Sequence, residues 1–240
     1  MQNMRIVALD SSGLVATVAI VEDDSLVAEY TVNYKKTHSQ TLLPMLDEIV
    51  KMIGFDMEQI DAIAVAAGPG SFTGLRIGSA TAKGLGLALD KPIIPVPTVD
   101  GLAYNLFGVK ELVCPMMDAR RNQVYTGLYA FEDGNMKCII PQKAVAVEEI
   151  LEEINQKGQP VIFLGDGVPV QKETIAKMVI VPYQFAPAHL ARQRAGALGA
   201  LAQVYYKEGR YENARDHKPD YLRLSQAERE RMEKEKGEQA

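Results

Sequence analysis

The spacing of apolar residues changes along the chain and separates short strands from longer helices. Residues 4–10, 14–21 and 26–32 are rich in apolar and β-branched residues and are joined by short turns, which predicts three strands of an antiparallel meander. From Leu42 to Ile53 the period changes, because apolar residues recur three or four positions apart and a glycine follows. This spacing predicts an amphipathic helix.

Two further strands and two further helices complete the first half of the chain. Residues 61–67 predict a buried strand, which runs into a Gly-Pro-Gly turn at 68–70 and then into a glycine-rich helix. Residues 92–96 predict another strand, and 98–106 a short helix.

The same order of elements returns after residue 110, which indicates an internal duplication. Strands are expected at 111–117, 123–131, 136–140 and 161–164, and helices at 147–154 and about 188–207. Each half places an aspartate, Asp10 or Asp118, after its first strand and a Gly-x-Gly turn after its fourth. We therefore expect an α/β protein with halves 1–107 and 108–224, followed by a charged tail at 225–240 that is disordered or a solvated helix.

Composition narrows the class of protein. The 240 residues carry a net charge of −5 and give a pI near 5.4, which argues against autonomous binding of nucleic acid. No basic-plus-apolar leader and no apolar run long enough for a bilayer is found, so we expect a cytoplasmic protein without a membrane contact. Cys114 and Cys138 are expected to be buried free thiols, and three histidines argue against a histidine-rich metal centre.

Small residues recur four positions apart in the glycine-rich segment, at Gly70, Gly74, Gly78, Ala82 and Gly86. Glycine inside a helix costs about 0.5–1 kcal/mol relative to alanine, so such a stripe needs a reason. The stripe either leaves room for a phosphate at the helix N-terminus or for close packing of another helix. The segment matches neither the Walker A loop nor the dinucleotide fingerprint, which favours packing.

Three polar groups remain open to more than one interpretation. Residues 10–13, Asp-Ser-Ser-Gly, either contact nucleotide phosphates, as in actin-like ATPases, or cap a hairpin turn. The paired arginines of 118–123 either grip an anion or form a turn held by local ion pairs, and we favour a structural or partner role. His38 and Ser39 are more readily explained by capping of the first helix than by a hydrolase.

Five stretches of the chain together resemble the bacterial TsaB (YeaZ) family, as far as about Arg223. The run 68–78, which reads Gly-Pro-Gly-Ser-Phe-Thr-Gly-Leu-Arg-Ile-Gly, is highly specific for that family. The other matching stretches are 6–12, 38–39, 118–121 and 219–223.

The resemblance implies an actin-like ATPase (ASKHA) fold built from two ribonuclease-H-like halves with mixed sheets. It also implies a role in making threonylcarbamoyladenosine beside the anticodon of tRNAs that read codons beginning with A. In that family TsaB is not the catalyst: it pairs with its paralogue TsaD, which performs the transfer, and the pair binds the ATPase TsaE. The resemblance implies contact with tRNA only through this complex.

The family pairs through its first two helices, in a four-helix bundle with TsaD, and we expect a homodimer through the same helices when TsaD is absent. The interface residues expected here are His38, Leu42, Leu46, Ile49, Gly70, Gly74, Leu75, Gly78 and Ala82. Asp10, Ser11 and Ser12 are expected to be a vestigial phosphate loop, with no cofactor beyond weak or interface-dependent adenine nucleotide.

One departure separates the chain from TsaD. TsaD-like proteins carry two metal-binding histidines spaced H-x-x-x-H, and the corresponding stretch here, 95–103, has Thr98 and Leu102. Neither side chain replaces imidazole as a ligand of a transition metal, so we expect no metal and no catalytic residue. The alternatives are an autonomous actin-like enzyme that binds ATP and, less favoured, a metallopeptidase, which requires zinc.

Overall fold

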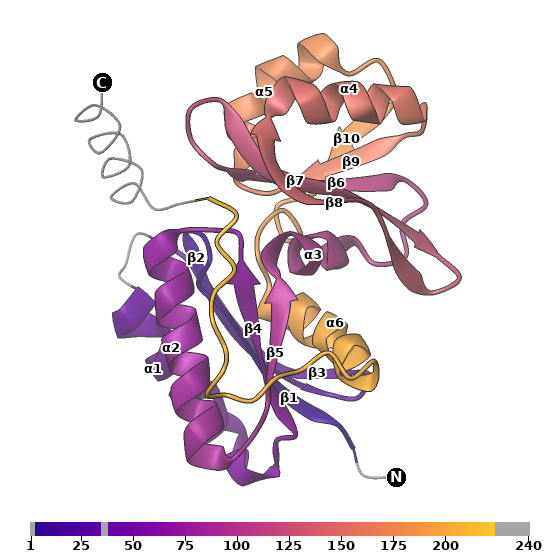
Figure 1. The fold of residues 1–240 in the computed structure, drawn as a ribbon. Helices are drawn as coiled ribbons and strands as arrows, with labels where there is room; N and C mark the ends of the chain where they lie inside the picture. Colours follow the sequence, from indigo (N-terminus) through magenta and orange to yellow (C-terminus); the bar gives the residue numbers. More distant parts are fainter. Residues whose placement is uncertain (1–2, 35–37, 224–240) are drawn as a thin grey trace, which may run out of the picture.

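The computed structural model describes residues 3–34 and 38–223, which form two α/β halves (Figure 1). The elements of the first half are β1 (Arg5–Asp10), β2 (Val15–Glu22), β3 (Ser25–Asn33), α1 (His38–Ile53), η1 (Met57–Gln59), β4 (Ala62–Gly68), α2 (Phe72–Leu89) and β5 (Ile93–Pro97). The link between the halves contains α3 (Thr98–Ala103) and η2 (Tyr104–Leu106). The remaining elements are β6 (Leu112–Asp118), β7 (Gln123–Glu132), β8 (Asn135–Ala146), α4 (Val147–Lys157), β9 (Val161–Leu164), α5 (Gly167–Met178), β10 (Tyr183–Phe185) and α6 (Ala195–Lys207).

The two sheets have the same topology, which confirms the duplication and the actin-like fold class. The first sheet has the order β3-β2-β1-β4-β5, and the second, taken from its other edge, has the order β8-β7-β6-β9-β10. In each half the first three strands pair antiparallel, and the fourth and fifth join in parallel. Both sheets are therefore mixed.

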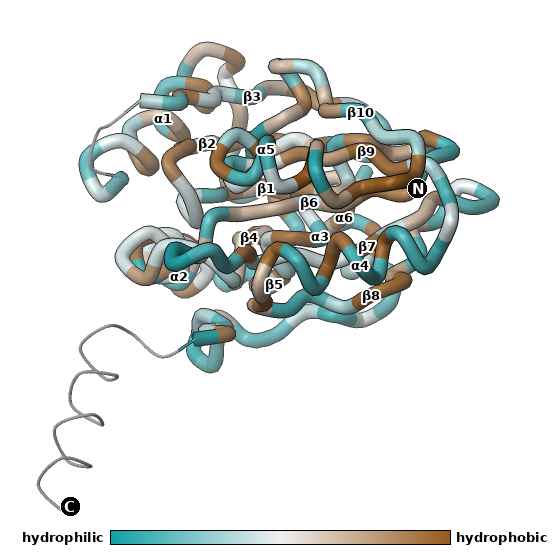
Figure 2. Tube along the Cα trace, turned by 90° about the horizontal axis from the view of Figure 1, so that it is seen from above, coloured by the Kyte–Doolittle hydropathy of each residue, from teal (hydrophilic) through white to brown (hydrophobic). Residues whose placement is uncertain are grey.

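Both faces of each sheet are covered. Successive residues of β1 point to opposite faces, so Val7 and Leu9 pack with α1 and α2 while Ile6 and Ala8 pack with α6. In the second half, α4 and α5 cover one face and α3 covers the other. In Figure 2 the turns of α4 alternate between brown and teal, as expected for a helix with one buried face.

The structure corrects four sequence-based expectations for the second half. A helix at 167–178, α5, follows the Gly-x-Gly turn and was not expected, and the helix expected from about residue 188 begins only at Ala195. That last helix, α6, lies against the first sheet, although a division at residue 107 assigns it to the second half (Figure 1). Cys114 is buried as expected, but Cys138 is exposed.

The expected tail at 225–240 lies outside the described residues. Within the described ranges, no helix combines the length and the apolar character needed to cross a bilayer.

Candidate functional site

A cleft of about 630 Å³ lies between the two halves. The first half contributes the β1–β2 turn, His38 and the start of α2, and the second half contributes the end of β6 and the start of α5. Arg120, Arg192 and Arg223 reach it from three separate segments. Both apolar and charged side chains line the cleft. Whether a phosphate can bind there depends on which groups of the expected phosphate loop are free to contact it.

Asp10 is buried and does not line this cleft. Its side chain is 3% exposed, and its Oδ1 accepts a hydrogen bond from the Ser12 backbone N at 2.7 Å. Burial raises the pKa of Asp10 to about 6, because a charged carboxylate is poorly solvated there. Of the expected phosphate loop, Ser12 lines the cleft, whereas Asp10 and Ser11 do not.

The β1–β2 turn packs directly on the start of α2, where a phosphate would otherwise bind. The Ser12 carbonyl accepts a hydrogen bond from the Ser71 N at 2.7 Å, and the Ser11 hydroxyl donates to the Gly74 carbonyl at 2.9 Å. The Ser71 hydroxyl caps the helix by accepting from the Gly74 N at 3.3 Å. These contacts between the chain's own groups favour packing over phosphate binding.

The glycine stripe of α2 faces inward, which corrects the expectation that it meets another chain. A Cβ atom on Gly70 would lie 2.5 Å from the Ser12 carbonyl oxygen, and one on Gly74 would lie 2.0 Å from that of Ser11. A Cβ on Gly78 would lie 2.8 Å from the Ser11 hydroxyl. The missing side chains leave room for the β1–β2 turn of the same chain.

The structure also corrects the expectation that the apolar residues of α1 and α2 lie at an interface, because these residues belong to the chain's own core. Leu42, Leu46 and Ile49 of α1 are at most 5% exposed and pack on the first sheet together with Ala82. Leu75 of α2 is likewise buried. None of these side chains is free to contact a partner, although a pairing through the two helices stays a prediction.

His38 begins α1 and contacts the β1–β2 turn. Its Nε2 lies 2.7 Å from the Gly13 carbonyl oxygen, so this nitrogen carries the proton and donates it to that oxygen. Because the bond goes to a carbonyl and not to a serine hydroxyl, it does not support the hydrolase alternative. Ser39 lies inside α1 and is not its N-cap.

The outer face of α2 carries a second row of small and apolar residues, none of which is among the interface residues expected from the sequence. Its members are Thr73, Ile77, Ala80, Gly84 and Leu87, spaced alternately four and three positions apart and exposed or half-buried. A Cβ on Gly84 would meet no atom within 4 Å, so this side of the helix is open. The heptad-like spacing is the signal by which the row could have been found.

The neighbouring face of α1 extends this row. Leu43 is 51% exposed, and Pro44 and Asp47 lie beside it on the same face. A groove between the helices is lined by these residues together with Val50 and Leu85. We call the outer row of α2 and this face of α1 the helix-pair surface.

The arginine turn between β6 and β7 is held by local contacts. Arg120, Arg121 and Asn122 all have positive φ angles, of 65°, 54° and 58°. The Arg120 N donates to Asp118 Oδ1 at 2.9 Å, and the Asp118 N donates to Asp166 Oδ1 at 3.1 Å. These bonds support the structural interpretation of this turn, and burial raises the pKa of Asp166.

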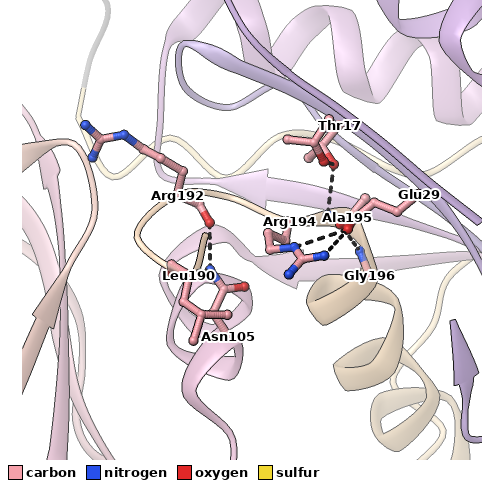
Figure 3. A network of polar contacts seen from close by, with 9 residues as sticks. Thr17, Glu29, Asn105, Leu190, Arg192, Arg194, Ala195 and Gly196 are labelled. Atoms are coloured by element: carbon pink, nitrogen blue, oxygen red, sulfur yellow. Dashed lines mark hydrogen bonds and ion pairs between the residues drawn. The ribbon is translucent and has the colours of Figure 1, made fainter. Parts of the chain in front are cut away.

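The segment that returns from the second half to α6 is fixed by a polar network (Figure 3). The Asn105 amide donates to the Leu190 carbonyl at 2.9 Å and to the Arg192 carbonyl at 2.6 Å. Farther along, the Arg194 guanidinium pairs with Glu29 of β3. The Arg192 side chain points away from this network and lines the cleft.

Thr98 and Leu102, which stand where TsaD-like proteins have histidines, are buried in the core around α3. Among the residues that the structure describes, no group of three His, Cys, Asp or Glu side chains is placed to hold a metal.

Comparison with known proteins gives consistent results. The family model described as "TsaD: tRNA N6-adenosine threonylcarbamoyltransferase" matches residues 25–231. The tRNA threonylcarbamoyladenosine biosynthesis protein TsaB of Bacillus subtilis (strain 168) is 34% identical, with 97% of this chain and 100% of the relative covered. The protein of the same name from Escherichia coli (strain K12) is 33% identical, with 64% of this chain and 67% of the relative covered.

A solved structure, YeaZ from Pseudomonas aeruginosa, superposes with a TM-score of 0.76 at 26% identity and covers 91% of this chain and 100% of that one. The family match extends over most of the chain, and the structural match includes both halves. The chain therefore belongs to the TsaD-like family of tRNA threonylcarbamoyladenosine biosynthesis proteins, on its TsaB (YeaZ) branch.

Proposed function

We propose that the chain is a non-catalytic subunit in the synthesis of threonylcarbamoyladenosine beside the anticodon of tRNAs that read codons beginning with A. It pairs with TsaD, which performs the transfer, and the pair recruits TsaE. The names of the relatives support the pathway. The single observation that supports this role is the helix-pair surface, where small and apolar residues of α1 and α2 are open to solvent.

The outer row of α2 suits a helical partner for two reasons. Alternating steps of four and three residues keep a row on one side of a helix and match the packing of helices at a small crossing angle. Ala80 and Gly84 lie at the middle of the row, so another backbone can approach closely there. The exposed side chains of Leu43 and Leu87 would lose their contact with water in such a pairing.

The same surface fits a second copy of the chain, so we propose a homodimer when TsaD is absent. Two copies of one patch form an isologous contact, which closes as a dimer. We also propose that the chain acts in the cytoplasm. Its net charge of −5 disfavours binding to tRNA by the chain alone, so contact with tRNA is proposed to occur only in the complex.

Reconstitution tests the proposal. TsaD and TsaE would be mixed with tRNA, threonylcarbamoyl-adenylate and ATP, with and without this chain, and modified adenosine would be measured. We expect the product to require the chain. If TsaD forms the product equally well without it, the role as an activating subunit is refuted.

A matched pair of variants tests the surface. Ala80→Arg places a long charged side chain in the outer row, whereas Gln156→Arg makes the same change of charge at an exposed position of α4. We expect Ala80→Arg alone to abolish binding to TsaD and self-association in sedimentation. Association that survives Ala80→Arg would place the interface elsewhere.

Calorimetry with ATP and magnesium on the isolated chain addresses the competing enzyme hypothesis. We expect no stoichiometric binding, because the β1–β2 turn and the start of α2 contact each other directly. Tight binding at one site per chain would favour the autonomous enzyme.

A further inference from the structure

The C-terminal segment contains the stretch 219–223, for which the proposed pairing gives no role. After α6 the chain runs along α2 from its C-terminal end toward its N-terminal end, and Figure 1 shows this segment in yellow beside the helix. We call residues 211–223 the C-terminal strap. Its two parts are attached to the molecule in different ways.

The N-terminal part of the strap is a buried anchor. Ala214 fills the notch at Gly86, where an added Cβ would lie 2.8 Å from the Ala214 Cβ. The His217 ring is 1% exposed, with its Nε2 2.9 Å from the Ser79 hydroxyl and its Nδ1 2.7 Å from Glu212. Since Ser79 is also buried, the three residues do not form a nucleophilic site but fix the strap to α2.

The C-terminal part of the strap is more exposed and reaches the cleft. The Tyr221 ring, 37% exposed, stacks on Phe72 at 4.4 Å between centroids, and the Arg76 guanidinium lies 4.1 Å from the Phe72 ring centre. Arg223 then crosses to the second half, where its Nη1 donates to the Ala119 carbonyl at 2.7 Å. Both Tyr221 and Arg223 line the cleft.

We propose that residues 219–223 form a clasp across the mouth of the cleft. The clasp joins the first turn of α2 to the arginine turn of the second half and thereby couples the opening of the cleft to the helix that carries the outer row. Phe72 and Thr73 are neighbours in α2, so the residue held by the clasp directly precedes the helix-pair surface. This inference does not depend on the identity of the partner.

The difference in burial between the anchor and the clasp indicates that the clasp can open while the anchor stays in place. Segments with few buried contacts open at lower free energy than the core, whereas the anchor has two buried side chains, Ala214 and His217. The Asp220 N also donates to the Ala67 carbonyl at 2.7 Å, which sets the clasp at the end of β4. Opening therefore frees the exposed end of the clasp, residues 221–223, while Asp220 and the anchor stay attached.

Paired spin labels on the full chain test the clasp. Labels would be attached to cysteines at Glu48 and Glu173, which are exposed and lie in different halves, in a Cys138→Ser background. The labelled protein would be diluted with unlabelled chain, so that only distances within one molecule are measured. We expect Arg223→Ala and Tyr221→Ala to shift the distance distribution to longer values and broaden it.

The control variant is Lys218→Ala, which changes an exposed residue of the same strap. It should leave the distribution as in the parent protein. Arg223→Lys keeps a donor and should retain most of the parent distribution, which separates loss of the clasp from loss of folding. An unchanged distribution in both alanine variants would overturn the clasp.

A second measurement tests the coupling between the clasp and α2. Hydrogen exchange of the peptide that covers residues 70–76 should become severalfold faster in Tyr221→Ala and remain unchanged in Lys218→Ala. If the label distances change while exchange at 70–76 does not, the clasp closes the cleft but does not act on the helix, and the coupling is refuted.

Discussion

Gly74 and Gly84 lie in the same helix, yet the absence of a side chain has a different consequence at each. At Gly74 the β1–β2 turn occupies the position that a Cβ would need, with the Ser11 oxygen only 2.0 Å away. At Gly84 there is open space. The first glycine is therefore required by the fold, while the second only leaves a surface free.

This difference predicts opposite effects of the same substitution. Gly74→Ala should lower the free energy of unfolding by about 1–3 kcal/mol, because backbone atoms must shift. Gly84→Ala should raise it by about 0.5–1 kcal/mol, because alanine is the better helix former. Urea denaturation of the two variants checks both signs. A similar effect at the two positions would contradict the inward orientation of Gly74.

The buried carboxyl group of Asp10 predicts a dependence of stability on pH. Because its pKa is about 6 in the folded protein, against 3.8 as the ordinary value, the folded state holds a proton that the unfolded state releases. The stabilising effect of this proton is complete below about pH 4 and is lost as the pH rises through 6. A shift of this size corresponds to about 3 kcal/mol.

Asp10→Asn keeps an oxygen that can accept from the Ser12 amide but cannot ionise. The free energy of unfolding of the variant, relative to the parent, should therefore increase by up to about 3 kcal/mol between pH 4 and pH 8. Denaturation curves at the two pH values give this difference. If the difference does not change with pH, the carboxyl group is not buried in its neutral form.

At the scale of elements, the sequence was sufficient to predict strands and helices where their hydrophobic periodicity is strong. The strands and helices of the first half and the repeat of strand order follow from their apolar patterns, which are clearest in the buried strands β1, β2, β4 and β5. α5 was missed because only four of its twelve residues are buried, so its apolar pattern is weak. β8 extends beyond the expected 136–140 to Ala146, as the partner of the long strand β7.

Orientation was harder to predict than the presence of an element. Small residues occur on two sides of α2, and spacing alone does not say which side meets the β1–β2 turn. α6 offers a similar case, since Gly199 packs on Val21 and Ala8 of the first sheet, a contact that depends on the path of the whole chain. The sequence analysis therefore placed the glycines of the candidate interface on the outer side of α2, whereas they face the β1–β2 turn of the same chain.

At the scale of the whole molecule, Asp100 joins the two halves through its position on α3. Its Oδ1 accepts from the Tyr129 hydroxyl of β7 at 2.6 Å, and its Oδ2 accepts from the Tyr205 hydroxyl of α6 at 2.7 Å. Burial and the nearby Asp100 charge raise the pKa of both tyrosines, so both hydroxyls remain donors. One carboxylate thus connects elements that cover different sheets, and nothing in the sequence around it signals this role.

Removal of these hydroxyls tests the connection. Tyr129→Phe should lower the free energy of unfolding by about 1–3 kcal/mol, because a buried hydrogen bond to a carboxylate is lost. The combined variant with Tyr205→Phe should lose more than either alone, since Asp100 then keeps neither tyrosine partner. Tyr125→Phe is the control on the same strand, because its hydroxyl makes no hydrogen bond within the described part of the chain. Equal denaturation midpoints for Tyr129→Phe and Tyr125→Phe would show that Asp100 does not hold the halves together.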